Sequence, residues 1–162
     1  MKEDMFDVLL YLFENFISEN PNNLPESPEV ITSALENAGF PSPEIHKAFS
    51  WLEGLTMLQE LNLEAPQPIN QQSFRIFNAE EFARLGALGI GFILFLEQYS
   101  IIDAETRELI MDRLLALENF EVDLEQVKWV ALIVIYHQHM DKEDLELFEE
   151  LLFLDNSSEI LH

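Results

Sequence analysis

The chain has 162 residues, is 48% hydrophobic and carries a formal net charge of -23 at pH 7. This length and apolar content predict a compact folded protein and exclude a disordered one, despite the charge. Thirty-one acids against eight bases would repel a phosphate backbone, because affinity for nucleic acid rests largely on Lys and Arg. Free DNA or RNA is therefore disfavoured as a ligand.

The composition also bears on compartment. The chain has no cysteine, which removes disulfides and Cys-ligated metal sites and fits a reducing compartment. The residues from Met1 to Asp4 lack the basic region of a signal peptide. The apolar runs 85–96 and 127–136 are shorter than the ~20 residues that span a bilayer. We expect a cytoplasmic protein without a membrane segment.

The first three predicted elements are helices. Apolar spacing predicts a helix over 5–18, and Ser27-Pro28-Glu29 begins a second one that ends near Gly39. Ser42-Pro43-Glu44 repeats the start signal and opens a third, with a core stripe made of Ile45, Ala48, Phe49, Leu52 and Leu55. The short turn between the second and third helices indicates a helix-turn-helix.

A polar stretch from Glu64 to Gln72 follows, and residues 73–77 alternate as a short strand does. Three helices and a strand predict a winged-helix-like unit over 1–72, extended by the strand. We place the boundary in the loop 62–73 and a C-terminal helical bundle over 78–162. The predicted fold class is mostly α, with the N-terminal unit packed on this bundle.

In the second half, Asn78 with Glu81 has the spacing of a capping box and opens a helix that reaches about Tyr99. Its middle, 85–96, bears no charge, which predicts that other elements surround it. Three glycines in this helix are interpreted as sites of close helix packing: Gly86, Gly89 and Gly91.

Three more helices are expected. Asp103 caps a helix that ends near Glu118, and Asp123 with Gln126 caps one that is apolar over 127–136. A last helix, 142–154, has two apolar stripes, of which only one can face a single core. Its second stripe is a candidate interaction surface for a basic partner or a second copy: Leu147, Leu151 and Leu154. The alternative is that the helix lies between two layers of its own chain.

The third helix carries few groups that read bases. Its outward face shows Lys47, Ser50 and Gly54, flanked by acids and by Trp51, whereas base readout uses Arg, Lys, Asn and Gln. We therefore interpret this face, with Lys47 and Trp51, as a protein-facing or purely structural surface.

The remaining bases are interpreted as structural. Arg107 and Arg113 flank the apolar face of their helix and are expected to pair with carboxylates, with Glu97 as a candidate partner; Lys128 is placed similarly. An anion site at these arginines is the alternative.

No catalytic, cofactor or metal site is predicted. The cluster of His137, His139 and Asp141 is a weak metal signal, because two residues of separation does not place both imidazoles on one helix face. Motifs for phosphate binding or hydrolysis do not occur. An enzyme with an unrecognised site at the arginines or histidines is the third and least favoured hypothesis.

Several blocks of the sequence together resemble the Smg family of small acidic bacterial proteins. They are Met5 to Leu9, Tyr11 to Glu14, Trp51 to Glu53, Gly91-Phe92, Phe95 to Gln98, Glu105 to Glu108 with Arg113, Lys128 to Val130, Glu150 to Phe153, and the terminal Leu161-His162. The resemblance covers 5–162, and Met5 matches the family's usual start, so either Met1 or Met5 can begin the chain. It implies no catalytic or binding residue.

Two functions from different classes follow. The first is a non-enzymatic adaptor that binds another protein, either a second copy of the chain or a basic protein whose encounter the acidic surface would accelerate. The second is a nucleic-acid-associated regulator that uses the helix-turn-helix together with a partner.

Overall fold

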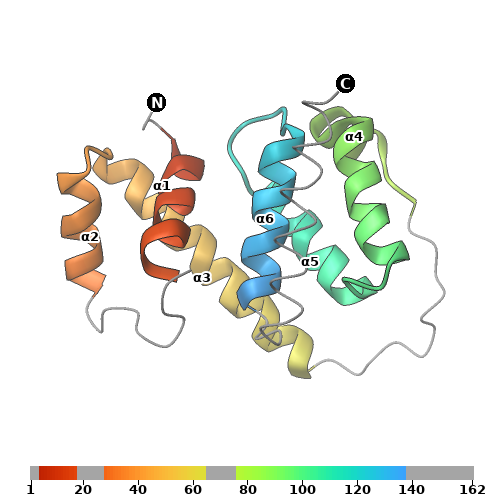
Figure 1. Ribbon diagram of the computed structural model, residues 1–162, viewed down its shortest axis with the longest axis horizontal. Helices are drawn as coiled ribbons and strands as arrows, with labels where there is room; N and C mark the ends of the chain where they lie inside the picture. Colours follow the sequence, from red (N-terminus) through yellow and green to blue (C-terminus); the bar gives the residue numbers. More distant parts are fainter. Residues whose placement is uncertain (1–3, 18–27, 65–75, 138–162) are drawn as a thin grey trace, which may run out of the picture. The chain divides into compact units, whose positions relative to one another are not determined.

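The computed structural model describes residues 4–17, 28–64 and 76–137. Their elements are α1 (Met5–Leu12), η1 (Phe13–Ile17), α2 (Pro28–Asn37), α3 (Ser42–Glu64), α4 (Ala79–Gln98), α5 (Ala104–Leu115) and α6 (Leu124–His137), shown in Figure 1. The prediction of a mostly α protein is confirmed, and these three ranges contain no strand. None of the described helices is long and apolar enough to cross a membrane.

The chain forms two compact units, 1–57 and 58–162. The division falls inside α3, whereas much of the loop 62–73, where we expected a boundary, lies outside the described residues. The predicted strand 73–77 is likewise only partly described. Ile76 and Phe77 belong to no strand, and residues 73–75 lie outside the described ranges. The winged-helix interpretation therefore remains a prediction.

The first helix is shorter than expected. Asp4 caps α1 by accepting a hydrogen bond from the Asp7 N–H at 3.0 Å. The predicted α-helix over 5–18 is wrong beyond Leu12, where η1 is a π-helix. In η1 the Asn15 side-chain amide donates to the Tyr11 carbonyl oxygen at 2.9 Å. That oxygen is the acceptor that the N–H of residue 15 would use in a regular α-helix, a competition that hydrophobic spacing does not report.

The turn between α2 and α3 has the geometry of a Schellman motif. Gly39 has φ +100, and the N–H of Phe40 donates to the Leu35 carbonyl at 3.2 Å while that of Gly39 donates to Glu36 at 3.0 Å. Leu35 and Phe40 are both buried, which is the apolar contact that accompanies the motif. The prediction of Gly39 as the end of this helix is confirmed.

α3 is much longer than a recognition helix needs to be. It begins at Ser42 and continues to Glu64, shortly before Pro66.

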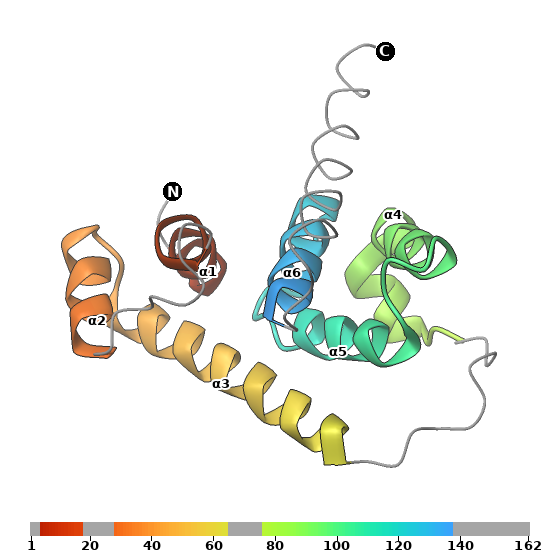
Figure 2. The same cartoon turned by 60° about the horizontal axis from the view of Figure 1, so that its bottom comes forward.

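In the C-terminal unit, α4, α5 and α6 pack on one another. α4 and α6 run in the same direction in Figure 1, and α5 lies across them in Figure 2. The core includes Ile93 from α4, Ile110 and Leu114 from α5, and Leu132 from α6, each at most 2% exposed. α6 is buried along most of its length, as its apolar run predicted.

The three predicted caps of this unit are confirmed. Asn78 and Glu81 form the reciprocal bonds of a capping box, at 3.0 and 2.8 Å, and Asp123 and Gln126 do the same at 3.1 and 2.8 Å. Asp103 accepts from the Thr106 N–H at 2.7 Å. α5 ends at Leu115, before the predicted Glu118, because contacts described below fix the following loop.

The glycines of α4 have different roles. Gly86 has φ +70 and ψ 169, so it breaks the helix into two parts joined by a kink, which the sequence did not predict. Gly89 allows close packing, as expected, because a Cβ there would lie 3.1 Å from Val127 Cγ2 on α6. Gly91 is exposed with no atom close to the position of a Cβ, so the packing role predicted for it is wrong.

The end of α4 repeats the Schellman motif without glycine. Ser100 has φ +59, the Ile101 N–H donates to the Leu96 carbonyl at 2.9 Å, and the Ser100 N–H donates to Glu97 at 3.0 Å. A serine in this left-handed conformation stores backbone strain, because its Cβ crowds the carbonyl oxygen.

Candidate functional site

The outward side of α3 is apolar and acidic. Its base, Lys47, forms an ion pair with Glu44 at 3.1 Å, and the lysine side chain is 40% exposed. Further along the same side, Met57 is 63% and Leu61 is 59% exposed. The exposed acids Glu53 and Glu60 lie beside them, and we refer to Glu53, Met57, Glu60 and Leu61 as the α3 outer row.

Trp51 does not belong to this outward side. It is 3% exposed, so its placement on a candidate interaction surface is wrong for the described structure. Its neighbours in the helical stripe, Ala48 and Leu55, are also buried, and Trp51 lies three residues after one and four before the other. Phe49 and Leu52, which we expected in the core stripe, are only half-buried.

A second apolar surface lies on α4. Leu88 is 75%, Phe95 37% and Tyr99 64% exposed, and Phe92 between them is half-buried. The Phe95 ring lies 6.5 Å from that of Phe92 and 4.6 Å from that of Tyr99, measured between centroids. We refer to Leu88, Phe92, Phe95 and Tyr99 as the α4 row. For the elements that the structure describes, the prediction that other elements surround 85–96 is therefore wrong on this face, because the lack of charge reports apolarity and not burial.

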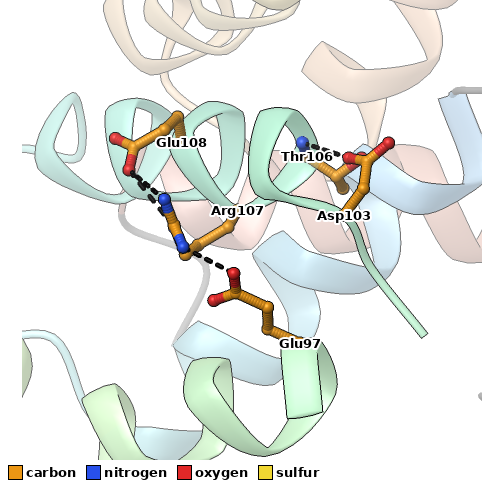
Figure 3. Close-up of polar contacts among 5 residues, drawn as sticks. All are labelled: Glu97, Asp103, Thr106, Arg107 and Glu108. Carbon is orange, nitrogen blue, oxygen red and sulfur yellow. Dashed lines mark hydrogen bonds and ion pairs between the residues drawn. The ribbon is translucent and has the colours of Figure 1, made fainter. Parts of the chain in front are cut away.

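Arg107 confirms the predicted ion pair with Glu97. Its Nη1 lies 2.6 Å from Glu97 Oε1, and its Nη2 and Nε lie 3.1 and 3.2 Å from Glu108 Oε1 (Figure 3). The arginine side chain is 6% exposed and the Glu97 side chain 28%. The guanidinium thus joins the end of α4 to the first turns of α5, and its recorded partners are carboxylates, which argues against an anion site.

The expected pairing with a carboxylate is confirmed for Arg113, although its partner is not Glu97, and Lys128 has a contact with an aromatic ring. Arg113, with a side chain that is 11% exposed, pairs with its neighbour Asp112 at 2.7 Å rather than with Glu97. Lys128 is 5% exposed, and its Nζ lies 5.7 Å from the centroid of the Phe92 ring. This cation–π contact links α6 to the α4 row.

Arg84 is the side chain that the sequence analysis missed. Its guanidinium donates to the carbonyl oxygens of Leu115 at 2.8 Å, Leu117 at 2.9 Å, and Asn119 and Phe120 at 3.2 Å. The backbone also takes part, because the Val122 N–H donates to the Arg84 carbonyl at 2.8 Å. A cation at the carbonyl end of α5 complements the helix dipole and satisfies free carbonyls.

The loop between α5 and α6 is thereby fixed by one side chain from α4. No spacing rule connects positions 31 to 36 residues apart, so the only signal for Arg84 was the scarcity of bases in the chain.

The remaining candidate residues lie at or beyond the end of α6. His137 is exposed at its last position, and His139 and Asp141 lie outside the described residues, as do Leu147, Leu151 and Leu154. Among the residues that the structure describes, no group of three His, Asp or Glu side chains could hold a metal ion.

Fold and surface together define a class: an acidic, mostly helical protein in which the bases of the described ranges contact other groups of the same chain. The chain belongs to the Smg family, whose model, described as "Protein of unknown function (DUF494)", matches residues 5–162.

Relatives cover nearly the whole chain. The "Protein Smg homolog" of Nitrosococcus oceani is 43% identical over 164 residues, with all of both chains covered. The "Protein Smg homolog" of Halorhodospira halophila is 41% identical, again over both full chains. "Protein Smg" of Yersinia pseudotuberculosis is 44% identical over 151 residues, which are 92% of this chain and 95% of the relative. No solved structure matches the chain. Neither the family description nor these names state a catalytic activity.

Proposed function

We propose that this protein is a non-enzymatic cytoplasmic adaptor that binds a basic protein, and that the α3 outer row forms part of the contact. The observation that carries the proposal is the composition of this row: two exposed apolar side chains, Met57 and Leu61, lie beside the exposed carboxylates of Glu53 and Glu60 on the same helix. Apolar side chains supply contact energy, and flanking acids select a partner with Lys or Arg at matching positions.

The charge of the chain supports the same partner chemistry. A formal net charge of -23 accelerates encounter with a cationic protein and slows encounter with a polyanion. Lys47, the base on this side of α3, is in an ion pair with Glu44, so its charge is partly compensated. The predicted stripe of Leu147, Leu151 and Leu154 remains a second candidate contact for the same partner.

The nucleic-acid alternative rests on one observation, the succession of α2, a tight turn and α3. A winged-helix-like unit could use this arrangement once a partner had supplied positive charge. The isolated chain offers too little of it, because phosphate binding scales with the number of available Lys and Arg. We therefore rank a regulator of this kind second.

Cross-linking in the native cell, followed by identification of partners, tests the proposal. The full-length protein is also immobilised and partners are eluted with increasing salt, since pairs of exposed charges are screened. We expect Glu53→Lys/Glu60→Lys and, separately, Met57→Ser/Leu61→Ser to reduce capture of the same basic protein.

The matched control is Glu36→Lys/Glu121→Lys, which makes the same change in net charge at exposed acids outside α3. Capture that falls equally in the control and in the Glu53/Glu60 variant would show that net charge, and not the α3 outer row, determines binding. A mobility shift of DNA by the isolated protein at low salt, lost steeply as salt rises, would favour the alternative.

A further inference from the structure

The α4 row is an apolar face that α5 and α6 leave uncovered. The buried positions of α4, including Ile90, Ile93 and Leu96, lie on the neighbouring face of the helix. The row lies on the side of α4 next to α6, because Lys128 of α6 lies against the ring of Phe92. Residues 85–96 contain no charged side chain, and Glu97 at the end of the row is paired with Arg107. An acidic segment could therefore lie along the row without facing close carboxylates.

The chain continues from the end of α6 with such a segment. α6 ends at His137, and residues 138–162 follow. The interval 142–154 contains apolar residues at helical spacing on one side, Leu145, Phe148 and Leu152. On the other side are Leu147, Leu151 and Leu154, so the sequence predicts a helix with two apolar stripes.

The end of α6 has the position and direction from which the following segment can reach the α4 row. α4 and α6 run in the same direction in Figure 1. They approach each other at Gly89 and Val127, since a Cβ on Gly89 would lie 3.1 Å from Val127 Cγ2. Ten residues further along each helix, at about 15 Å, are Tyr99 and His137. The chain thus leaves α6 level with the Tyr99 end of the row, and a segment that turns back after 138–141 would run towards Leu88.

The lengths match as well. From Leu88 to Tyr99 the row is about 17 Å long at the rise of an α-helix, and a helix over 142–154 is about 20 Å long. With Lys142 level with Gln98, the antiparallel register brings Leu152 opposite Leu88, Phe148 opposite Phe92, and Leu145 opposite Phe95.

We propose that residues 142–154 dock as a helix on the α4 row of the same chain, antiparallel to α4, through Leu145, Phe148 and Leu152. This arrangement leaves Leu147, Leu151 and Leu154 facing outward. The inference does not depend on the proposed adaptor function, because it concerns which side of this segment belongs to the core.

The absence of cysteine from the natural chain allows a direct test. The full-length variant Leu88→Cys/Leu152→Cys is oxidised at low protein concentration, and its products are separated on non-reducing gels. A disulfide needs Cα atoms within about 7 Å, so it reports the predicted register. The matched control is Leu88→Cys/Leu154→Cys, whose second cysteine lies on the opposite side of the predicted helix. Helical circular dichroism of the reduced variants checks that both are folded.

We expect Leu88→Cys/Leu152→Cys to form a disulfide within one chain several-fold faster than the control, at a rate independent of concentration. A disulfide-linked dimer that increases with concentration would overturn the proposal in favour of a second copy on the row. Equal rates for the two pairs, or no disulfide in either, would overturn it in favour of a row open to another protein.

A second measurement needs no cysteine. If the row is covered, Leu88→Asp and Leu152→Asp each lower Tm, and the double variant loses less than the sum, because the two changes break one contact. Leu88→Asp with Leu154→Asp should be additive. Additivity in the first pair as well would contradict the docking.

Discussion

The polar contacts within the N-terminal unit differ from those within the C-terminal unit. In the N-terminal unit, several recorded polar side-chain contacts connect residues three or four apart, such as Asp4 with Asp7 and Lys47 with Glu44. In the C-terminal unit, Arg84 reaches carbonyls 31 to 36 residues away, and Arg107 reaches Glu97 across the junction of two helices. Among the described residues, these contacts of the first unit are local, whereas those of the second include single arginines that connect distant segments.

The chain provides a reporter for each unit. It has two tryptophans, Trp51 in the first unit and Trp129 in the second. Denaturant unfolding of full-length protein in a Trp129→Phe background follows the first unit, and a Trp51→Phe background follows the second. Because Arg84 and Arg107 lie in the second unit, we expect substitutions of these arginines to change mainly the Trp129 signal.

The largest effect is expected for Arg84→Ala. Hydrogen bonds from a charged group contribute roughly 1.5–3 kcal/mol each in favourable cases but are not additive, and water can reach this partly exposed site. We expect a loss of roughly 2–3 kcal/mol in the free energy of unfolding reported by Trp129. Hydrogen exchange should also accelerate in the loop that contains Leu117 and Asn119.

Arg84→Lys is the control. It keeps the charge but lacks the planar fork that reaches several carbonyls at once, so it should recover only part of the stability. Full recovery by lysine would show that charge at the end of α5, and not the hydrogen-bond geometry, is what matters.

The next largest effect is expected for Glu97→Ala. It removes the 2.6 Å partner of an arginine side chain that is 6% exposed. A loss of roughly 1–2 kcal/mol should follow, limited by the remaining contact with Glu108 and by water at the Glu97 side. Glu105→Ala is a suitable comparison, since this acid is in the first turn of α5, the helix that carries Arg107. Equal losses in the two variants would mean that the removal of a negative charge, and not the loss of the ion pair with Arg107, lowers the free energy of unfolding.

In the N-terminal unit, Gly39→Ala should cost about 1 kcal/mol. The φ of +100 is unfavourable for a residue with a Cβ, although no atom lies within 4 Å of the position that a Cβ would take. The loss should be visible in Trp51 fluorescence and not in Trp129 fluorescence. A change in both signals would show that the two units unfold together.

The smallest effect is a gain. Ser100→Gly relieves the φ of +59 at the end of α4, while glycine costs entropy in the unfolded chain. We expect a net stabilisation of about 0.5 kcal/mol in the C-terminal unit. Ser100→Ala, which retains a Cβ, should not stabilise, and a gain there would indicate that the hydroxyl and not the backbone conformation was unfavourable.

Sequence reasoning succeeded where the relevant partners were close together along the chain. The caps at Asn78, Asp103 and Asp123 were predicted because each bond joins residues three positions apart. It was less reliable on which face of a helix is buried. Trp51 was expected outside and is inside, because positions three or four apart on a helix lie within about 60° of each other and Trp51 has this spacing to buried residues. Residue 88 was expected inside and is outside, because the lack of charge in 85–96 reports apolarity and not burial.

By itself, then, the sequence determined the helical class, most helix starts, the acidic character and the family. Hydrophobic period, caps and composition express these properties locally. Tertiary structure decided that Arg84 holds the α5–α6 loop, that Gly86 kinks α4, and that the α4 row remains outside the packing of α4, α5 and α6. Such contacts depend on how helices that are distant in sequence pack against one another, and short-range sequence patterns do not predict this packing.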